Sequence, residues 1–476
     1  MATMAPGVYV TEVPSADKPI AGVGTSTAGF IGIFDDNDAG HARAGDVKLC
    51  TNFTEFAKAF GDFSTVDGQR MLAHAVYGFF NNGGTRCFVV RETPTGNFDA
   101  MLAKFEAIDE IAIVAAPGIT SAAARASIIA HCAQATQDRF AIFDTGKDVE
   151  LAAFSGTQSE SKAVADAKAA ADAKAAEAGA AKTKAAADTK AADDKLAAAK
   201  AATTGTAEAK AAAVKAAEEE LAKAKDAEGK AAADAKAAED NAAAAKAAAE
   251  TRSVAALPPS TSYAALYYPW LQVFDPATKK ASPTGDGSIL VPPSGHIAGI
   301  YARVDANRGV HKAPANEVVL GALGVNAAVS KAGQAGVNEK GVNCIRSLNG
   351  NILVWGARTL AGPNEQDLKY INVRRLLLFL RESIEEGTQW VVFEPNTPAL
   401  WQKIKRNITA FLTNVWRDGA LFGDTAQEAF YVKCDAETNP ASERDNGRVV
   451  AEIGVAIVRP AEFVIFTISQ WAGPAK

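Results

Sequence analysis

The sequence predicts a multi-domain α/β protein of mixed α+β character, with extended N- and C-terminal β-arms and an Ala/Lys-rich helical insertion. Continuous apolar segments such as Gly29–Phe34 alternate with helical patterns such as Phe53–Phe60, which is typical of a largely parallel sheet covered by helices. Both ends of the chain are apolar, and about half of residues 161–250 are Ala. A chain of 476 residues is long enough for several domains.

Residues 1–25 are predicted to form an N-terminal arm and its linker. Gly7–Val13 is β-branched and aromatic on both faces, which predicts a strand. Pro14–Gly24 is rich in proline and small residues, and we expect it to be extended and to flex. The strand residues of this arm are Val8, Tyr9, Val10 and Thr11.

Residues 26–153 are the first part of the predicted α/β domain. Asn52, with Glu55 three residues later, predicts the start of a helix at Phe53–Phe60. A second helical pattern ends at Asn81–Gly84. The remaining elements of this part are strands at Arg86–Arg91, Ile111–Ala116 and Phe140–Asp144, and a helix from about Ser121 to Gln137.

Residues 154–252 are the predicted insertion. Residues 161–250 hold four large apolar residues and therefore cannot bury a core, yet their helix propensity is close to the maximum. Thr203–Thr206 divides this stretch into two halves, which predicts either a helical hairpin or a fluctuating, partly helical segment. We favour the hairpin and place it on the outer surface.

The second part of the α/β domain is predicted at residues 253–362, followed by a C-terminal domain at 363–460 and a C-terminal arm at 461–476. The expected elements are a strand region at Ala264–Val273, a helix after Pro292–Gly299, a helix from Pro363 to Gly387, a strand at Gln389–Glu394, and a helix from Pro398 to Arg417 capped by Thr397. The last strand, Glu462–Gln470, carries Phe463, Val464, Ile465 and Phe466.

Composition excludes several classes of protein. A net charge of −6 argues against a nucleic-acid binder, and no run of about 18 apolar residues suggests a membrane span. The first six residues lack the basic and apolar regions of an export signal. Five cysteines stand singly along the chain, which predicts free buried thiols in a reducing cytoplasm.

The search for catalytic chemistry finds two weak signals. Ala115–Gly118 follows a strand and could hold a phosphate, although one glycine makes an ordinary turn the better interpretation. His296 and His311 lie near Arg303, Asp305 and Arg308, but this spacing matches no metal site and favours a polar packing role. We expect no catalytic residue, no metal and no cofactor.

The amphipathic helix Pro398–Arg417 carries a basic stripe opposite its apolar face. The stripe consists of Lys403, Arg406 and Arg417, at helical spacing. Such a stripe is usually a solvated surface, and it could also contact an acidic partner.

The two apolar ends must each pair with something, because an unpaired strand edge is an aggregation hazard. Donation of a strand to another copy and pairing within the domain are about equally favoured by the residues alone.

Seven segments together resemble the contractile tail sheath proteins of bacteriophages, pyocins and extracellular contractile injection systems. They are PGVYVTEV (Pro6–Val13), GFIGIF (Gly29–Phe34), FFNNGGTRCFVVR (Phe79–Arg91), IAIVAAPG (Ile111–Gly118), VPPSGHIAGIYARVDANRGVHKAPAN (Val291–Asn316), NVRRLLLFLRESIEEGTQWVVFEPN (Asn372–Asn396) and RPAEFVIFTISQ (Arg459–Gln470). The resemblance covers the chain except about residues 154–252, so it implies nothing about the insertion.

The resemblance implies a non-enzymatic subunit that stacks in helical rings around an inner tube and contracts when a baseplate triggers it. It also implies that both arms add strands to neighbouring subunits and that the C-terminal domain lies innermost, against the tube. The implied partners are other copies, the tube protein, and baseplate and terminator proteins, with assembly in the bacterial cytoplasm as part of a phage tail or tail-like particle. The alternative is an α/β enzyme that binds a phosphate or nucleotide.

Overall fold

The computed structural model describes residues 19–36, 38–154, 162–254 and 257–465. The chain divides into two compact units, one made of Met1–Asp148 with Pro258–Lys476 and the other of Val149–Leu257. Each unit is described by itself below.

The first unit contains all the strands that the described residues form. They are β1 (Ala28–Ile33), β2 (Lys48–Cys50), β3 (Cys87–Glu92), β4 (Ile113–Ala115), β5 (Phe140–Asp144), β6 (Ala264–Tyr268), β7 (Leu271–Phe274), β8 (Ser288–Val291), β9 (Glu317–Val318), β10 (Ala322–Val325), β11 (Val342–Leu348), β12 (Asn351–Val354), β13 (Phe430–Lys433) and β14 (Glu452–Val455).

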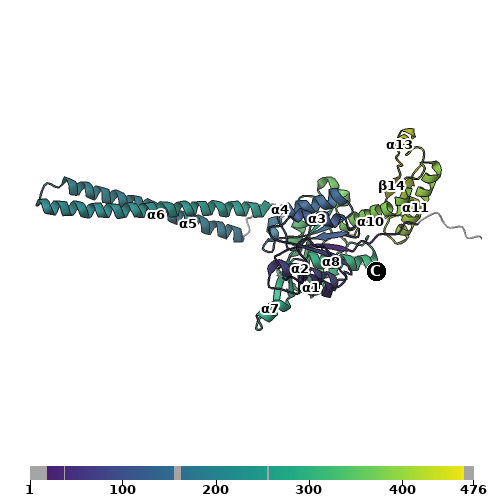
Figure 1. Ribbon diagram of the computed structural model, residues 1–476, viewed down its shortest axis with the longest axis horizontal. Helices are drawn as coiled ribbons and strands as arrows, with labels where there is room; N and C mark the ends of the chain where they lie inside the picture. Colours follow the sequence, from purple (N-terminus) through teal and green to yellow (C-terminus); the bar gives the residue numbers. More distant parts are fainter. Residues whose placement is uncertain (1–18, 37, 155–161, 255–256, 466–476) are drawn as a thin grey trace, which may run out of the picture. The chain divides into compact units, whose positions relative to one another are not determined.

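The helices of this unit are α1 (Phe53–Phe60), α2 (Asp67–Asn81), α3 (Phe98–Glu106), α4 (Ala122–Ala130), α7 (Pro276–Ala281), α8 (Ser294–Arg308), α9 (Lys331–Asn338), α10 (Ile371–Thr388), α11 (Pro398–Arg417), α12 (Ala426–Ala429) and α13 (Ala441–Asp445). Helices such as α2, α3 and α8 lie around the main group of strands, whereas α11 and α13 lie beside β14 (Figure 1). Shorter turns are a π-helix at His131–Thr136 and 3-10 helices at Pro363–Leu368 and Gln389–Val391.

Nine strands form the main sheet, in the order β2-β3-β1-β4-β5-β6-β11-β12-β9. The strands from β3 to β11 in this order run parallel. At the edges the pairs β2–β3, β11–β12 and β12–β9 are antiparallel. Strands such as β5 are buried at every residue, which agrees with their continuous apolar sequence. The predicted α/β class is therefore confirmed.

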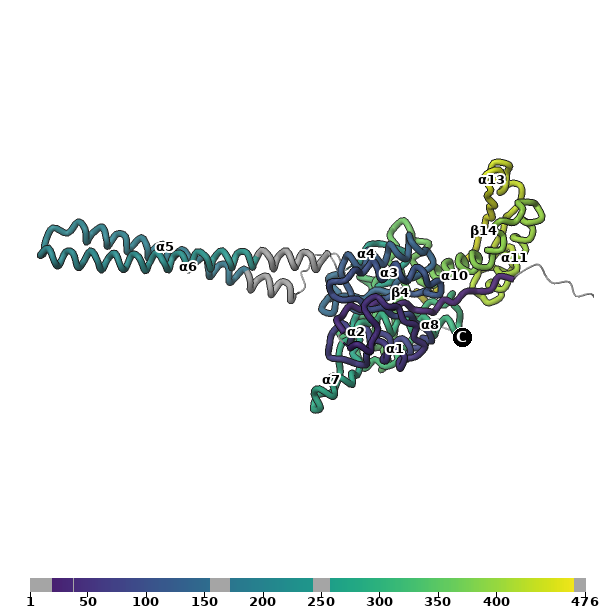
Figure 2. Tube along the Cα trace, viewed as in Figure 1, coloured from purple at the N-terminus to yellow at the C-terminus, as the bar shows by residue number. Residues whose placement is uncertain are grey.

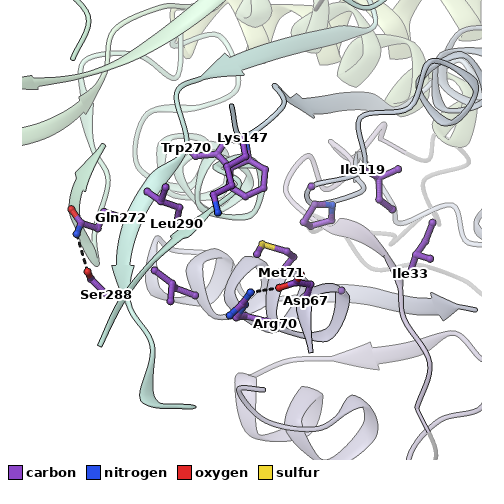
Figure 3. A pocket seen from close by; sticks show the side chains of 14 residues that line it. Ile33, Asp67, Arg70, Met71, Ile119, Lys147, Trp270, Gln272, Ser288 and Leu290 are labelled. Atoms are coloured by element: carbon purple, nitrogen blue, oxygen red, sulfur yellow. Dashed lines mark hydrogen bonds and ion pairs between the residues drawn. The ribbon is translucent and has the colours of Figure 1, made fainter. Parts of the chain in front are cut away.

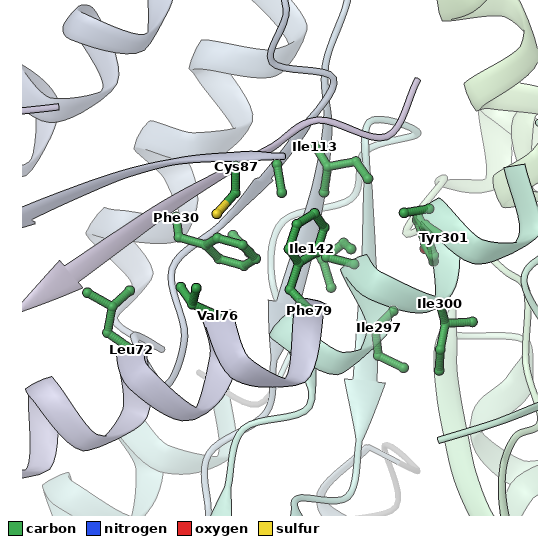
Figure 4. Close-up of a cluster of buried hydrophobic side chains, with 14 of the residues drawn as sticks. Phe30, Leu72, Val76, Phe79, Cys87, Ile113, Ile142, Ile297, Ile300 and Tyr301 are labelled. Atoms are coloured by element: carbon green, nitrogen blue, oxygen red, sulfur yellow. The ribbon is translucent and has the colours of Figure 1, made fainter. Parts of the chain in front are cut away.

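The main core lies between the sheet and the packed helices α2 and α8 (Figure 4). Phe30 on β1 meets Phe79 on α2 edge to face, with ring centroids 5.5 Å apart. A Cβ on Gly295 of α8 would come within 2.3 Å of the backbone of Ala75. Only glycine therefore allows the two helices to approach this closely.

A second core joins α10, α11 and the small sheet β13–β14. The apolar face predicted for α11 is confirmed, because its buried residues are Leu400, Trp401, Ile404, Asn407, Ile408, Phe411, Leu412 and Val415. Thr397 caps this helix by accepting a hydrogen bond from the Leu400 N–H at 3.4 Å. Asn52 likewise caps α1, accepting from the Glu55 N–H at 2.9 Å.

Two predicted elements of the C-terminal part are wrong. The helix expected from Pro363 to Gly387 is interrupted before α10, because Tyr370 pairs as an isolated bridge with Arg358. Gln389–Glu394 is a 3-10 turn followed by an irregular segment, and not a strand. Phe393 is 102% exposed there with φ of 68°, so this apolar run has no sheet to enter.

The second unit consists mainly of two long helices, α5 (Lys162–Ala201) and α6 (Ala207–Val254), which pack together as a hairpin. Small and aliphatic side chains, among them Leu196 and Leu221, form its seam. An ion pair between Lys195 on α5 and Glu220 on α6 (2.5 Å) joins the two helices. The two elements therefore form the hairpin that the Thr203–Thr206 break favours.

All five cysteines are buried as free thiols, as their scattered positions predict. Among the described residues, no helix combines the length and apolar character needed to cross a membrane.

Candidate functional site

A hollow of about 600 Å³ lies where parallel strands of the main sheet end, and it is the place where an α/β enzyme would bind a ligand. It is lined by Pro117 and Gly118 of the candidate phosphate loop and by Trp270 and Lys147, the last two labelled in Figure 3. The guanidinium of Arg70 turns to Asp67 within this hollow.

The backbone of the candidate phosphate loop already donates a hydrogen bond to a carboxylate of the protein itself, that of Asp144. The Gly118 N–H donates to Asp144 Oδ2 at 3.1 Å. Asp144 also accepts from the Ser294 N–H at 2.8 Å and from Ser294 Oγ at 2.6 Å, so it lies at the first turn of α8. Burial raises the pKa of Asp144 to about 6, against the hydrogen bonds from Ser294 and Gly118. The donors that a phosphate would need are therefore occupied, and the ordinary turn is the better interpretation.

The residues of the second weak signal do not converge on one site. His296 is buried beside Gly78, and burial lowers its pKa to about 3, which keeps the imidazole neutral. Arg303 donates to the Asn82 and Val318 carbonyls, while Asp305 pairs with Arg375. No group of three or more His, Cys, Asp or Glu in the described part of the chain could hold a metal ion.

The apolar face of α11 is buried, and the basic stripe lies on another side of the same helix. Arg406 and Arg417 are exposed and Lys403 is partly buried. The arrangement of the helix agrees with the spacing that predicts the stripe, whereas the contact with an inner tube stays a prediction.

A small antiparallel sheet, which the sequence reasoning missed, lies next to α11. It consists of β13 and β14, with Phe430 opposite Val455 and Lys433 opposite Glu452. No third strand joins this sheet among the described residues. Its signal was the short β-branched and aromatic run of β13, too brief to stand out from its surroundings.

The arm residues fall partly outside the described residues. The arm residues outside the described part of the chain are Val8, Tyr9, Val10, Thr11 and Phe466. The strands predicted for them therefore stay a prediction. Phe463, Val464 and Ile465 are described; they belong to no strand and are 70%, 68% and 86% exposed. Three consecutive large apolar side chains are thus left exposed in the described part of the chain.

An exposed run of large apolar side chains such as Phe463–Ile465 is typical of a surface that contacts another chain. Residues 176–360 match the phage tail sheath protein central domain, and residues 364–470 match the phage tail sheath C-terminal domain. Together these matches cover more than half of the chain. The chain belongs to the phage tail sheath protein family.

Similar proteins carry the same description. A tail sheath protein of Burkholderia phage BcepMu is 28% identical over 211 residues, 43% of this chain and 42% of that protein. A prophage major tail sheath protein of Pseudomonas aeruginosa, itself described as putative, is 26% identical over 245 residues, 46% of this chain and 59% of that protein. The chain thus spans about half the length of the curated relatives it matches.

A solved structure shares the fold over nearly the whole chain. It is the sheath complex of an extracellular contractile injection system, PVC, in its contracted state, with a TM-score of 0.64 and 22% identity. The likeness covers 99% of each chain.

Proposed function

We propose that this protein is the structural subunit of a contractile sheath, which polymerises as helical rings around an inner tube and contracts to drive the tube through a target envelope. Family membership and the likeness to a sheath complex in its contracted state support this role. Its partners are other copies of this chain, an inner tube protein, and baseplate and terminator proteins. Assembly takes place in the bacterial cytoplasm, and the product is a phage tail or tail-like particle.

Subunits are joined by exchanged strands. The observation that carries this proposal is the combination of an exposed apolar segment, Phe463–Ile465, with a sheet that has only two strands among the described residues. Two strands alone are marginally stable, and added strands would supply the missing ladder hydrogen bonds. A head-to-tail exchange does not close on itself and therefore makes a filament.

The C-terminal domain, residues 363–460, faces the tube, and the stripe of Lys403, Arg406 and Arg417 contacts it. Exposed ion pairs are individually weak, so they can fix register and still release the tube on contraction. The protein is not an enzyme; the work comes from subunit packing rather than from hydrolysis.

The strand-exchange proposal is tested by removing residues 1–15. The expected product is a folded, soluble protein that forms no tubes or polymers in negative-stain microscopy. Val10→Pro should act in the same way, because proline deletes a ladder donor, whereas Ala2→Pro, before the predicted strand, should polymerise normally. Normal contractile sheaths from the truncated protein would show that strand exchange is wrong for this chain.

A further inference from the structure

The described base of the N-terminal arm runs beside α10 (Figure 2). Ile20 packs against Gly387, and the side chain of Phe379 lies against Gly22. The Val23 N–H donates to Ser383 Oγ at 3.1 Å. Residues 19–24 are thus held along the helix in an irregular, extended segment, and the flexing expected of Pro14–Gly24 stays a prediction.

A buried ion pair secures the inner end of this base. Arg375 of α10 donates to both carboxylate oxygens of Asp305, at 2.9 and 2.6 Å. Thr25 joins the pair twice, because its hydroxyl donates to Asp305 at 2.6 Å and its carbonyl accepts from Arg375 at 2.9 Å. The guanidinium also lies over the ring of Tyr301, 4.6 Å from its centroid.

The base of the C-terminal arm is held at the beginning of the same helix. Glu462 accepts two hydrogen bonds from Arg358, both at 2.9 Å. It also accepts from the hydroxyl of Tyr370, the residue before α10, at 2.9 Å, and from Asn338 Nδ2 at 2.6 Å. Burial opposes ionisation of Glu462, but the hydrogen bonds from these partners outweigh it and lower the pKa of the carboxyl.

Arg358 and Tyr370, two of the residues that bind Glu462, are themselves held in place by the body of the protein. The side chain of Asn343 on β11 accepts from the Arg358 N–H and donates to its carbonyl, both at 2.7 Å. Tyr370 pairs with Arg358 as an isolated antiparallel bridge. Both main partners of Glu462 are therefore set by the body of the protein, and the three exposed apolar residues begin immediately after it.

We propose that Glu462 is a positioning residue, which fixes the point and direction in which the C-terminal arm leaves the subunit. One of its partners, Tyr370, immediately precedes α10, and α10 holds the root of the N-terminal arm. This inference rests on the proposed exchange of strands. Holding the root of an arm reduces the conformational freedom that is lost when the arm pairs, and so favours assembly without adding an intersubunit contact.

The test compares Glu462→Ala with Glu385→Gln, an exposed glutamate on α10 that serves as the matched control. Val464→Cys is introduced in each for spin labelling, since all five natural cysteines are buried. Glu462→Ala should remain folded by circular dichroism, make the label at 464 several-fold more mobile in the monomer, and lower the pelletable polymer about tenfold. The control should match the parent in all three measurements.

Equal label mobility and equal polymer yield in Glu462→Ala and the control would overturn the inference. Where Glu462→Ala fails to fold, Glu462→Gln, which keeps the size and part of the hydrogen bonding, gives the same comparison. A third variant that ends at Ala461 separates the two proposals. If it polymerises normally, strand exchange itself is wrong; if it alone fails to polymerise, exchange holds and only the positioning role is wrong.

Discussion

Gly387 lies so close to Ile20 that a Cβ on the glycine would come within 2.7 Å of the isoleucine side chain. The contact joins the last turn of α10 to the base of the N-terminal arm. It predicts that replacing Gly387 by Ala destabilises the protein, the opposite of the usual effect of this substitution in a helix. Gly to Ala inside a helix normally stabilises by up to about 1 kcal/mol.

We expect Gly387→Ala to lower the free energy of unfolding by about 1 kcal/mol, because Ile20 must move. Gly336→Ala on α9 is the control, since nothing lies within 4 Å of its added Cβ, and it should stabilise. Urea denaturation measures both. In a variant lacking residues 1–21 the Gly387→Ala substitution should also stabilise; a persistent loss there would show that Ile20 is not the cause.

Asn343→Ala should be strongly destabilising. The variant removes a buried side chain that satisfies the backbone of Arg358 on both sides, and a buried group left unsatisfied costs about 1–3 kcal/mol. Asn351→Ala, on an exposed position of the adjacent strand, should change the free energy of unfolding by less than about 0.5 kcal/mol. Similar denaturation midpoints for the two variants would contradict the structural role of Asn343.

Asp144 predicts a pH dependence of stability. Its folded-state pKa, about 6, is above the unfolded value of roughly 4, so the folded state holds the proton more tightly. The contribution of protonated Asp144 to the free energy of unfolding is therefore fully present below pH 4 and is lost as the pH rises through 6. The difference in unfolding free energy between the parent and Asp144→Asn should fall over this range by on the order of 2 kcal/mol.

The exposed carboxylate Asp445 supplies the control for this series. Asp445→Asn should leave the pH profile of the parent unchanged between pH 4 and 7. A parent-minus-variant difference for Asp144→Asn that stays flat over the same range would mean that the buried carboxyl does not titrate there.

The sequence predicted the elements whose signal is local. The strand Phe140–Asp144 is apolar throughout because both faces are covered, and the cap at Thr397 and the buried face of α11 depend on residues a few positions apart. The apolar run Gln389–Glu394 led to a wrong strand prediction. Val392 and Phe393 are exposed, and Trp390 and Val391 are partly buried against the second core without belonging to a sheet.

The sites that escaped prediction depend on distant pairs. Glu462 meets Tyr370, Arg358 and Asn338 across 92, 104 and 124 positions of the chain, and no periodic pattern marks such an arrangement. Asp144 and Ser294 are likewise 150 positions apart. Only the fold brings these groups together.

The stripe on α11 gives a prediction about the tube. Reversing charge in the double variant Lys403→Glu, Arg406→Glu should give sheaths that assemble poorly on tubes or contract early, as scored by electron microscopy. Lys405→Glu is the matched control, because it is exposed on the same helix and outside the stripe. Extended, tube-bound particles from the double variant in normal number would exclude this helix as the tube contact.

The insertion should be dispensable for assembly. Val149–Leu257 is a compact unit of its own, and the rest of the chain has separate cores. Deleting Ser161–Glu250 and closing the gap with a short linker should reduce helical content by circular dichroism while tubes still form. Loss of polymers in this variant would mean that the hairpin takes part in subunit contacts.

The attachment of both arm bases to α10 also has a mechanical consequence. Tyr370 and Gly387 are 17 residues apart, about 25 Å of helix at 1.5 Å per residue. Tension between the two arms of one subunit enters α10 near its two ends and is carried along its axis, parallel to the backbone hydrogen bonds. At the C-terminal arm, Arg358 also binds Glu462 and is itself held by Asn343 of β11, so part of this tension passes into the nine-stranded sheet.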